Sequence, residues 1–297
     1  MKILVTGANG LLGQKLASRL MDDPTVEPVF TARKQLSIPL RRGVFETLDI
    51  TSSEQVTAVL TKHRPEVIIH TAAMTQVDDC EKDRAACWLN NVTATEYLAQ
   101  ACASLGIHMV HVSTDFIFDG KEGPLDEQAI PAPVNYYGES KLAAEKAVMS
   151  AGASWAILRT VLVYGVSADM SRSNIVLWVK KSLEEGKTIK VVNDQWRTPT
   201  LAEDLAQGCH LAAARKATGV FNISGEKMMT PYDIAITTAR QFHLNEQLIQ
   251  ATDSTQFKQP AARPLKTGFI ITKAKQVLGY KPHSFEEGLA LMATQLT

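Results

Sequence analysis

In the first half of the chain, short apolar runs alternate with longer stretches in which apolar residues recur every three or four positions. Leu12, Leu16 and Leu20 show the helical spacing, while Val67, Ile68 and Ile69 form a continuous run typical of a buried strand. The pattern predicts strands over residues 2–6, 26–31, 44–48, 67–70, 107–112 and 155–158, and helices over residues 11–21, 52–63, 83–105 and 135–150.

Strands that alternate with helices of this length form βαβ units, and such units produce a parallel sheet covered on both faces. Right-handed crossovers then give a doubly wound, Rossmann-type α/β fold, in which ligands bind at the carboxyl ends of the strands. We therefore expect the functional residues in the loops that follow the strands.

The pattern changes after about residue 164. Helices are predicted over residues 171–185 and 201–215, strands over residues 189–192 and 219–223, and the remainder is rich in helix. We expect residues 1–163 to form a dinucleotide-binding domain that part of residues 188–224 rejoins. Residues 164–187 and 225–297 are then a smaller mixed α/β lobe that binds the substrate.

Composition narrows the class of protein. The chain has 297 residues, of which 45% are hydrophobic and 21% charged, as in ordinary globular proteins. Its 31 Lys and Arg balance its 31 Asp and Glu, which argues against a general nucleic-acid binder. The sequence contains no apolar run long enough for a transmembrane helix and no signal peptide, so we expect a cytoplasmic protein without a membrane partner. Its four cysteines form no CxxC pair and are interpreted as reduced core residues.

Three glycines join the first predicted strand to the first predicted helix. Gly7 suits a tight turn, Gly10 lets the backbone approach a pyrophosphate, and Gly13 lets helix and strand pack closely. The helix N-terminus adds free N–H groups and a partial positive charge. The expected cofactor contacts here are Gly7, Asn9, Gly10, Leu11, Leu12 and Gly13.

The end of the second strand indicates which dinucleotide binds. The segment Thr31-Ala32-Arg33-Lys34 contains no acidic residue for a ribose hydroxyl, which favours NADP(H) over NAD(H), although NAD(H) stays possible. Arg33 is the expected phosphate ligand because its planar guanidinium suits a phosphate, unless this segment is simply a solvated loop. Asp49 and Ile50, at the end of the third strand, are expected beside the adenine.

A second group of residues suggests carbonyl chemistry. Tyr137 and Lys141 are four residues apart at the start of a predicted helix and so share one face. A lysine beside a phenol is expected to lower the tyrosine pKa. Thr114 follows the fifth strand, where its hydroxyl could bind a carbonyl oxygen beside that tyrosine.

Together, the TGxxGxxG loop, this hydroxyl and the YxxxK pair resemble the extended short-chain dehydrogenase/reductase family. Finer motifs are similar to the dTDP-4-dehydrorhamnose reductases within it. Residues 113–120 match their STDYVFDG motif, and residues 137–145 match YGxSKLxxE. Further matches are Leu158-Arg159-Thr160, Val163-Tyr164-Gly165, Asp194-Gln195 with Pro199-Thr200, and Arg263-Pro264.

This resemblance implies NADPH-dependent reduction of the C4 ketone of a nucleotide-linked deoxy sugar. Tyr137 would donate the proton, Lys141 would lower the tyrosine pKa and hold the nicotinamide ribose, and Thr114 would orient the carbonyl. Further expected cofactor contacts are Ala72, Ala73, Thr75 and Asn91, and the expected substrate contacts are Thr114, Asp115, Phe116, Asn174, Gln195 and Arg197. A homodimer is possible because such dimers are common in the family.

Departures from the family pattern keep alternatives open. Leu162 stands where the reductases have Trp, and Arg197 lies in a stretch that also departs, so the identity of the sugar is open. Some members bind magnesium through an acid two residues past the third glycine, where this chain has Lys15, so we expect no metal.

Three other functions compete with the reductase interpretation. One is another reaction of the extended family, epimerisation of a nucleotide sugar. Dehydration, a further reaction of that family, is disfavoured because Phe116, not an acid, follows Asp115. The second is reduction of a different carbonyl substrate. The third is a non-catalytic NADP-binding regulatory subunit resembling methionine adenosyltransferase β, which the Gln195-Trp196-Arg197 stretch before Pro-Thr keeps open.

The histidines of the predicted strands do not indicate a metal site. His70, His108 and His111 lack metal-ligand spacing and are expected in the core or in supporting positions.

Overall fold

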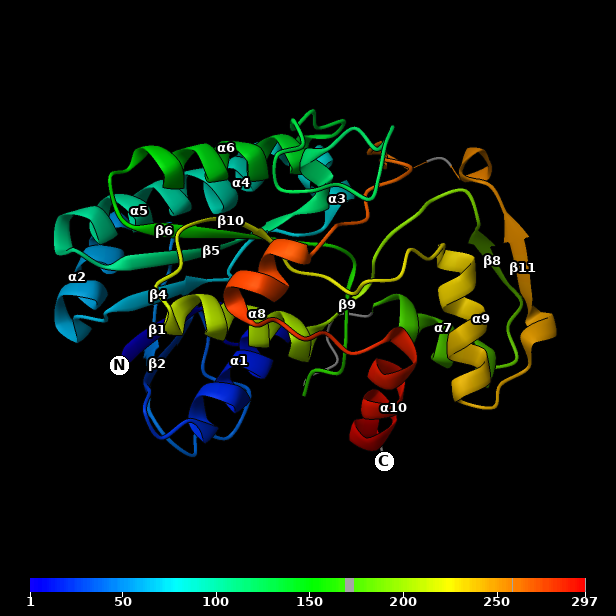
Figure 1. The fold of residues 1–297 in the computed structure, drawn as a ribbon, viewed down its shortest axis with the longest axis horizontal. Helices are drawn as coiled ribbons and strands as arrows, with labels where there is room; N and C mark the ends of the chain where they lie inside the picture. The colour runs from blue at the N-terminus through cyan, green and yellow to red at the C-terminus, as the bar shows by residue number, and fades with distance from the viewer. Residues whose placement is uncertain (169–173, 258, 297) are drawn as a thin grey trace.

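A seven-stranded parallel sheet forms the centre of the computed structural model, which describes residues 1–168, 174–257 and 259–296 (Figure 1). Its order is β10-β6-β5-β4-β1-β2-β3, and every pair is parallel. The strands are β1 (Lys2–Thr6), β2 (Glu27–Ala32), β3 (Val44–Thr47), β4 (Val67–His70), β5 (His108–Thr114), β6 (Trp155–Thr160) and β10 (Gly219–Asn222). The prediction of a doubly wound α/β fold is confirmed.

The register brings the carboxyl ends of the three central strands to one edge. Thr6 at the end of β1 lies beside His70 at the end of β4, and His70 lies beside His111 of β5. The loops that follow these strands therefore emerge next to one another, as expected for a ligand site in this fold.

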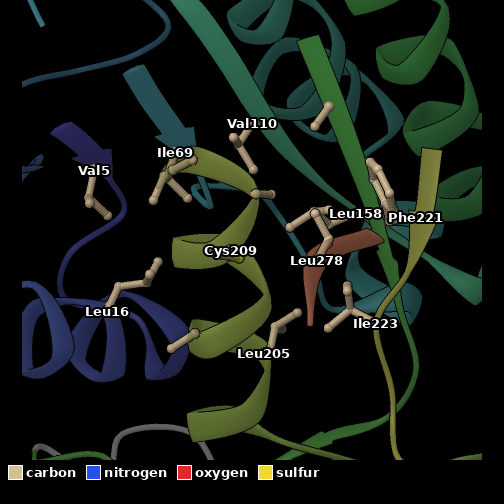
Figure 2. Packing of buried hydrophobic residues seen from close by; sticks show 14 of the residues in the cluster. Val5, Leu16, Ile69, Val110, Leu158, Leu205, Cys209, Phe221, Ile223 and Leu278 are labelled. Atoms are coloured by element: carbon tan, nitrogen blue, oxygen red, sulfur yellow. The ribbon is translucent and has the colours of Figure 1, made fainter. Parts of the chain in front are cut away.

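Helices cover both faces of the sheet because successive strand residues point to opposite sides. On one face, Ile3 and Val5 pack against α1 (Leu11–Asp22) and α8 (Ala202–Ala214). Figure 2 shows this layer, with Leu205 and Cys209 of α8 facing Ile69, Val110 and Leu158 of the sheet. On the other face, Leu4 packs with α2 (Ser53–His63), α5 (Ala94–Leu105) and α6 (Tyr136–Ser150).

The predicted long helix over residues 83–105 is divided in the structure. It consists of α4 (Arg84–Trp88), a π-helical turn η1 (Leu89–Thr93) and α5, and a short helix α3 (Val77–Lys82) that the sequence pattern did not predict precedes it. Asp83 separates α3 from α4 by accepting a hydrogen bond from Ala86 N (2.9 Å) as an N-cap. Such π turns are frequent at functional sites, and this one carries Asn91.

The remaining elements lie mainly beyond one end of the large sheet (Figure 1). They are β7 (Val163–Tyr164), α7 (Ile175–Glu184), β8 (Ile189–Val192), β9 (Thr200–Leu201), α9 (Pro231–Gln241), β11 (Ile249–Thr252) and α10 (Phe285–Leu296), with helical turns η2 (Asp115–Ile117), η3 (Glu246–Leu248), η4 (Ser254–Gln256) and η5 (Ala274–Leu278). Strand β8 pairs with β11, and β7 pairs with β9. The first three residues of the helix predicted over 171–185 lie outside the described residues.

Parts of the second half return to the large sheet. Within residues 188–224, α8 and β10 join the sheet layer, whereas β8 pairs with β11 away from it. Residues of the C-terminal segment, including Ile271 and Leu278, also belong to the cluster beneath the sheet. The division of the chain into two domains stays a prediction. Among the described helices, none has the length and apolar character needed to span a membrane.

Candidate active site

The glycine loop after β1 is shaped by close backbone approaches. Gly7 has a φ of +74°, and a Cβ there would lie 2.9 Å from Ala72 N, so the loop lies directly against the segment that follows β4. A Cβ on Gly13 would lie 2.2 Å from Gly7 O, which only glycine avoids. No side chain caps α1 at Gly10 and its first turn contains no acidic residue, so the free N–H groups of this helix end suit an anion.

Asn9 holds the loop that follows β2. Its Nδ2 donates to Lys34 O (3.3 Å) and Gln35 O (3.0 Å), and its Oδ1 accepts from Ser37 N (2.9 Å) and Ser37 Oγ (3.1 Å). One amide side chain thus connects the glycine loop to the segment expected to select the cofactor. Sequence reasoning assigned Asn9 to the cofactor but did not identify this contact.

Gln14, which is buried, extends the same connection. Its Nε2 donates to Asn9 O (3.0 Å) and Ser37 Oγ (3.4 Å), and its Oε1 accepts from Ala168 N (2.8 Å). The two amides therefore join the glycine loop, the loop after β2 and the segment that contains Ala168. The prediction did not include Gln14, because a polar residue inside an amphipathic helix is ordinarily solvent-exposed.

The positions expected to select the cofactor differ in exposure. Arg33 and Lys34 are exposed, whereas Ile50 is buried. Asp49 Oδ1 accepts from Thr51 N (3.0 Å) and Thr51 Oγ1 (2.8 Å). These hydrogen bonds, with a smaller contribution from the charge of Arg33, hold the pKa of Asp49 below its usual value. Strand β3 ends at Thr47, so Asp49 and Ile50 lie in the loop beyond it.

Tyr137 lies in the first turn of α6, against the end of β5. Asn135 caps this helix by accepting from Gly138 N (2.8 Å). A Cβ on Gly138 would lie 2.1 Å from Phe116 O, so this glycine allows α6 to approach the loop after β5. The Tyr137 ring packs edge-on against Phe116, with 5.8 Å between ring centroids, and the Thr114 side chain is near enough to affect the pKa of the Tyr137 hydroxyl.

Lys141 lies one turn further along α6 and is almost fully buried. Its Nζ donates to Val112 O (2.8 Å) and lies 3.3 Å from His111 Nε2. Burial lowers the Lys141 pKa to about 8, although the negative charges of Glu145 and Cys87 oppose this change. The structure thus brings together Thr114, Tyr137 and Lys141, as their motifs implied.

The predicted lowering of the tyrosine pKa is wrong for this structure. Burial raises the pKa of Tyr137 well above its ordinary value, and the charge of Asp115 adds to the increase. Hydrogen bonding with Thr114 acts in the opposite direction but is smaller. The physical reason is desolvation, because removing a phenolate from water is unfavourable and Lys141 directs its amine toward β5.

A buried ion pair fixes the helix that carries Tyr137 and Lys141. Glu145 of α6 and Arg159 of β6 interact through two bonds, Nε to Oε1 (3.0 Å) and Nη2 to Oε2 (2.8 Å). Both side chains are nearly inaccessible, so removing either one would leave an unpaired buried charge. Two family motifs that are distant in sequence therefore meet here.

Asn91, predicted to support the cofactor site, joins three segments. Its Oδ1 accepts from Met74 N (2.7 Å), and its Nδ2 donates to Met74 O (3.0 Å) and Ser140 Oγ (3.0 Å). This pairing holds the loop after β4, which contains Ala72, Ala73 and Thr75, against α6. Ala72 and Ala73 are partly buried and Thr75 is exposed.

Asp115 and Arg197, both predicted substrate contacts, form a buried pair. Arg197 Nε lies 3.7 Å from Asp115 Oδ2, and Thr267 Oγ1 donates to the same carboxylate. The guanidinium also donates to Trp196 O (2.8 Å), Leu265 O (3.1 Å) and Pro264 O (2.6 Å). Only 4% of Arg197 is exposed, so in this conformation its donors serve the protein itself.

The other expected substrate residues occupy varied surroundings. Asn174 caps α7 by accepting from Leu177 N (3.2 Å), and its Nδ2 donates to Gly165 O (2.7 Å). Gln195 is half-buried. Leu162, the departure from the family pattern, has a φ of +38°, and non-glycine residues with positive φ cluster at functional sites.

Two of the histidines that were expected in the core or in supporting positions, His70 and His111, lie beneath this site. His70 and His111 have ring centroids 5.3 Å apart, and both are almost fully buried. Their place in neighbouring predicted strands, His70 at the end of one and His111 inside the next, was the available signal. Among the described residues, no group of three or more His, Cys, Asp or Glu side chains could hold a metal ion.

Comparison with known families gives a match along the whole chain. Residues 1–297 match the family model described as RmlD substrate binding domain. The chain is 31% identical over 296 residues to the probable low-salt glycan biosynthesis reductase Agl14 of Haloferax volcanii, covering 98% of this chain and 97% of that protein.

A relative whose name indicates a different role has a similar identity to this chain. The chain is 33% identical over 248 residues to methionine adenosyltransferase 2 subunit beta of Xenopus laevis, covering 82% of this chain and 72% of that protein. Among solved structures, the dTDP-4-dehydrorhamnose reductase of Bacillus anthracis, in complex with NADP, is 28% identical with a TM-score of 0.85, covering 99% of both chains.

Proposed function

The chain belongs to the RmlD substrate binding domain family of extended short-chain dehydrogenases/reductases, and from this membership we propose that it reduces the C4 ketone of a nucleotide-linked deoxy sugar with NADPH. The observation that carries the proposal is that Thr114, Tyr137 and Lys141 are all buried where α6 packs against β5. This grouping lies at the carboxyl edge of the sheet, where the fold binds its ligands.

NADP(H) is the proposed cofactor, since a similar reductase was solved with NADP. The free N–H groups at the start of α1 would receive its pyrophosphate. Arg33, exposed and held near the glycine loop through Asn9, would contact the additional phosphate. Asp49, Ile50, Ala72, Ala73, Thr75 and Asn91 would line or support the same site. When bound, the cofactor supplies the hydride.

The chain's own residues handle the proton. A raised pKa keeps the Tyr137 phenol protonated at neutral pH, which suits a group that gives a proton to a ketone oxygen during reduction. The Thr114 hydroxyl, within reach of that phenol, orients the carbonyl. Lys141, with a pKa of about 8, carries a positive charge at neutral pH. Its Nζ donates to Val112 O in this structure, and its remaining N–H would hold the nicotinamide ribose when the cofactor is bound.

The proposed substrate contacts are Thr114, Asp115 and Phe116 around the end of β5, with Asn174 and Gln195 from the second half of the chain. Arg197 would take part through Asp115 or after a rearrangement, because its guanidinium is engaged in the protein. A homodimer and the division into a dinucleotide-binding domain and a substrate lobe complete the proposal.

The test is NADPH oxidation followed by absorbance, with a freshly prepared dTDP-4-keto-6-deoxy sugar as substrate and a parallel reaction with NADH. We expect rapid oxidation that prefers NADPH, together with a 4-hydroxy product identified by NMR. Tight NADPH binding without oxidation of the cofactor would contradict the proposal.

A second candidate is a regulatory subunit that binds NADP without turnover. The similarity to methionine adenosyltransferase 2 subunit beta favours it. Stable copurification with a methionine adenosyltransferase catalytic subunit, combined with no reduction of the keto sugar, would support this candidate over the reductase.

A further inference from the structure

His111 and Lys141 form a contact between the sheet and the helix that carries Tyr137. His111 lies on β5, Lys141 lies on α6, and 3.3 Å separates Nε2 of the histidine from Nζ of the lysine. The same Nζ donates to Val112 O at 2.8 Å. Both side chains are buried, with only 1% of His111 and 3% of Lys141 exposed, so water does not compete strongly for these bonds.

The neighbouring ring of His70 is fully partnered, and its protonation can be deduced. Thr95 Oγ1 donates to Asn91 O (2.7 Å) and can therefore only accept from His70 Nε2 (3.2 Å). His70 Nδ1 is then unprotonated and accepts from Thr6 Oγ1 (2.7 Å). His70 is thus a neutral ring fixed on both sides.

His111 differs from His70 because only one of its nitrogens has a partner. Burial, the charge of Lys141 and the presence of His70 all lower its pKa, so its ring is neutral at physiological pH. With Lys141 as an ammonium ion, His111 Nε2 must accept and the ring proton is on Nδ1. Nδ1 has no hydrogen-bond partner in the described part of the chain and is inaccessible.

An unpaired buried donor is unfavourable, and an apolar side chain at this strand position would avoid it. Packing alone therefore does not account for a histidine here. What an apolar residue could not provide is an acceptor for the lysine, and Nε2 supplies that acceptor without adding a negative charge.

We propose that His111 is a positioning residue that, together with Val112 O, holds two of the three N–H groups of Lys141 and so fixes the ammonium one helical turn from Tyr137 on α6. This role rests on the proposed function of Tyr137 and Lys141. The third N–H has no partner among the described residues and is left for the reacting groups. The other charged or titratable groups that act on Lys141 are Glu145 and Cys87, and His70 acts on His111.

Two substitutions separate the role of Nε2 from simple filling of space. In His111→Gln the amide reaches the position of Nε2, whereas in His111→Asn the shorter amide reaches only the position of Nδ1. His108→Gln is the matched control. This residue is a buried histidine of the same strand, and its Nδ1 lies 2.8 Å from Ser154 Oγ rather than near Lys141.

The first measurement needs no turnover. Protein labelled with 13C at the lysine ε carbon is titrated by NMR, and the Lys141 signal is assigned with a Lys141→Met variant. Losing a hydrogen bond to a charged group should reduce the proton affinity of Lys141 about tenfold or more in His111→Asn. His111→Gln and His108→Gln should titrate within twofold of wild type.

The second measurement is the pH profile of keto-sugar reduction. The fall in kcat at high pH should begin at lower pH in His111→Asn but not in His111→Gln. If the two His111 variants titrate alike, or if neither differs from wild type, the positioning role is wrong. Absence of turnover in the wild-type protein would contradict the reductase function alone, because the NMR titration still reports on His111.

Discussion

The two ends of the candidate site differ in how their polar groups are satisfied. At the glycine loop, the amides of Asn9 and Gln14 bond to the loop itself and to two neighbouring loops. At the end of β5, by contrast, His111 Nδ1 and Ser113 Oγ are buried without a hydrogen-bond partner in the described residues. Burial there also shifts the pKa values of Tyr137 and Lys141 in opposite directions.

This difference indicates that the two regions contribute to function in different ways, one by binding and the other by chemistry. The glycine loop is ordered by its own hydrogen bonds and can receive phosphates without rearrangement. The cluster at β5 places ionisable groups where water is excluded, and unpaired or shifted groups of this kind concentrate at reactive sites. Substitutions in the loop should therefore affect binding and stability, whereas substitutions in the cluster should affect the chemical step.

The largest expected effect is in the cluster. Tyr137→Phe removes the proton donor but keeps the ring that packs on Phe116. We expect kcat to fall about a thousandfold, while the Kd for NADPH, measured by fluorescence, stays within twofold. A variant that kept a tenth of wild-type activity would show that Tyr137 is not the donor.

The next largest effect should come from the loop. Gly13→Ala forces a Cβ to within 2.2 Å of Gly7 O, and overpacking of this kind costs about 3 kcal/mol. We expect a clear decrease in Tm together with weaker NADPH binding. Gly10→Ala is the control, because its Cβ would meet only Gly7 O at 3.3 Å. It should lose cofactor affinity but little stability, and equal losses of stability in both variants would contradict this interpretation of the loop.

A smaller effect tests the choice of cofactor. Arg33→Ser removes a charge-assisted bond to the additional phosphate of NADPH and should weaken NADPH binding about tenfold to a hundredfold. The Kd for NADH should be unchanged. Lys34→Ser is the control for removing one positive charge from this loop, since the Arg33 and Lys34 side chains are both exposed. If the two variants lose the same affinity for both cofactors, selection does not depend on Arg33.

The smallest expected effect concerns pH and the buried His70. Its pKa is lowered to about 3 by burial and by the charge of Lys141, against about 6.5 in the unfolded chain. Between these values the unfolded state binds more protons, so stability falls as pH falls below about 6.5.

For His70 alone, this difference in proton binding lowers the free energy of unfolding at pH 5.5 by about 1.4 kcal/mol. Urea unfolding at pH 7.5 and 5.5 should therefore show a smaller loss of stability in His70→Gln than in the wild type. His243→Gln, at an exposed position, should behave as the wild type does. An identical pH dependence in all three proteins would mean that His70 is protonated in the folded state.

Much of the fold followed from the sequence. The strand β1 and the helix α2 have nearly the predicted bounds, and Ser52 caps α2 by accepting from Gln55 N (3.3 Å). The π-helical turn at Leu89–Thr93 could not be predicted, because its residues have the same apolar spacing as an ordinary helix. Its presence depends on tertiary contacts of Asn91 with Met74 and Ser140.

The sequence alone determined the features that local backbone geometry controls. Glycine spacing places the loop after β1, the Tyr137–Lys141 spacing puts both side chains on one helix face, and the alternation of strands and helices determines the sheet. Only the tertiary structure decided which charges are buried and what they contact. Arg197 turns to backbone carbonyls and Asp115, and Lys141 of α6 meets His111 of β5. The physical reason is desolvation, which depends on packing between distant segments and therefore cannot be deduced from spacing along the chain.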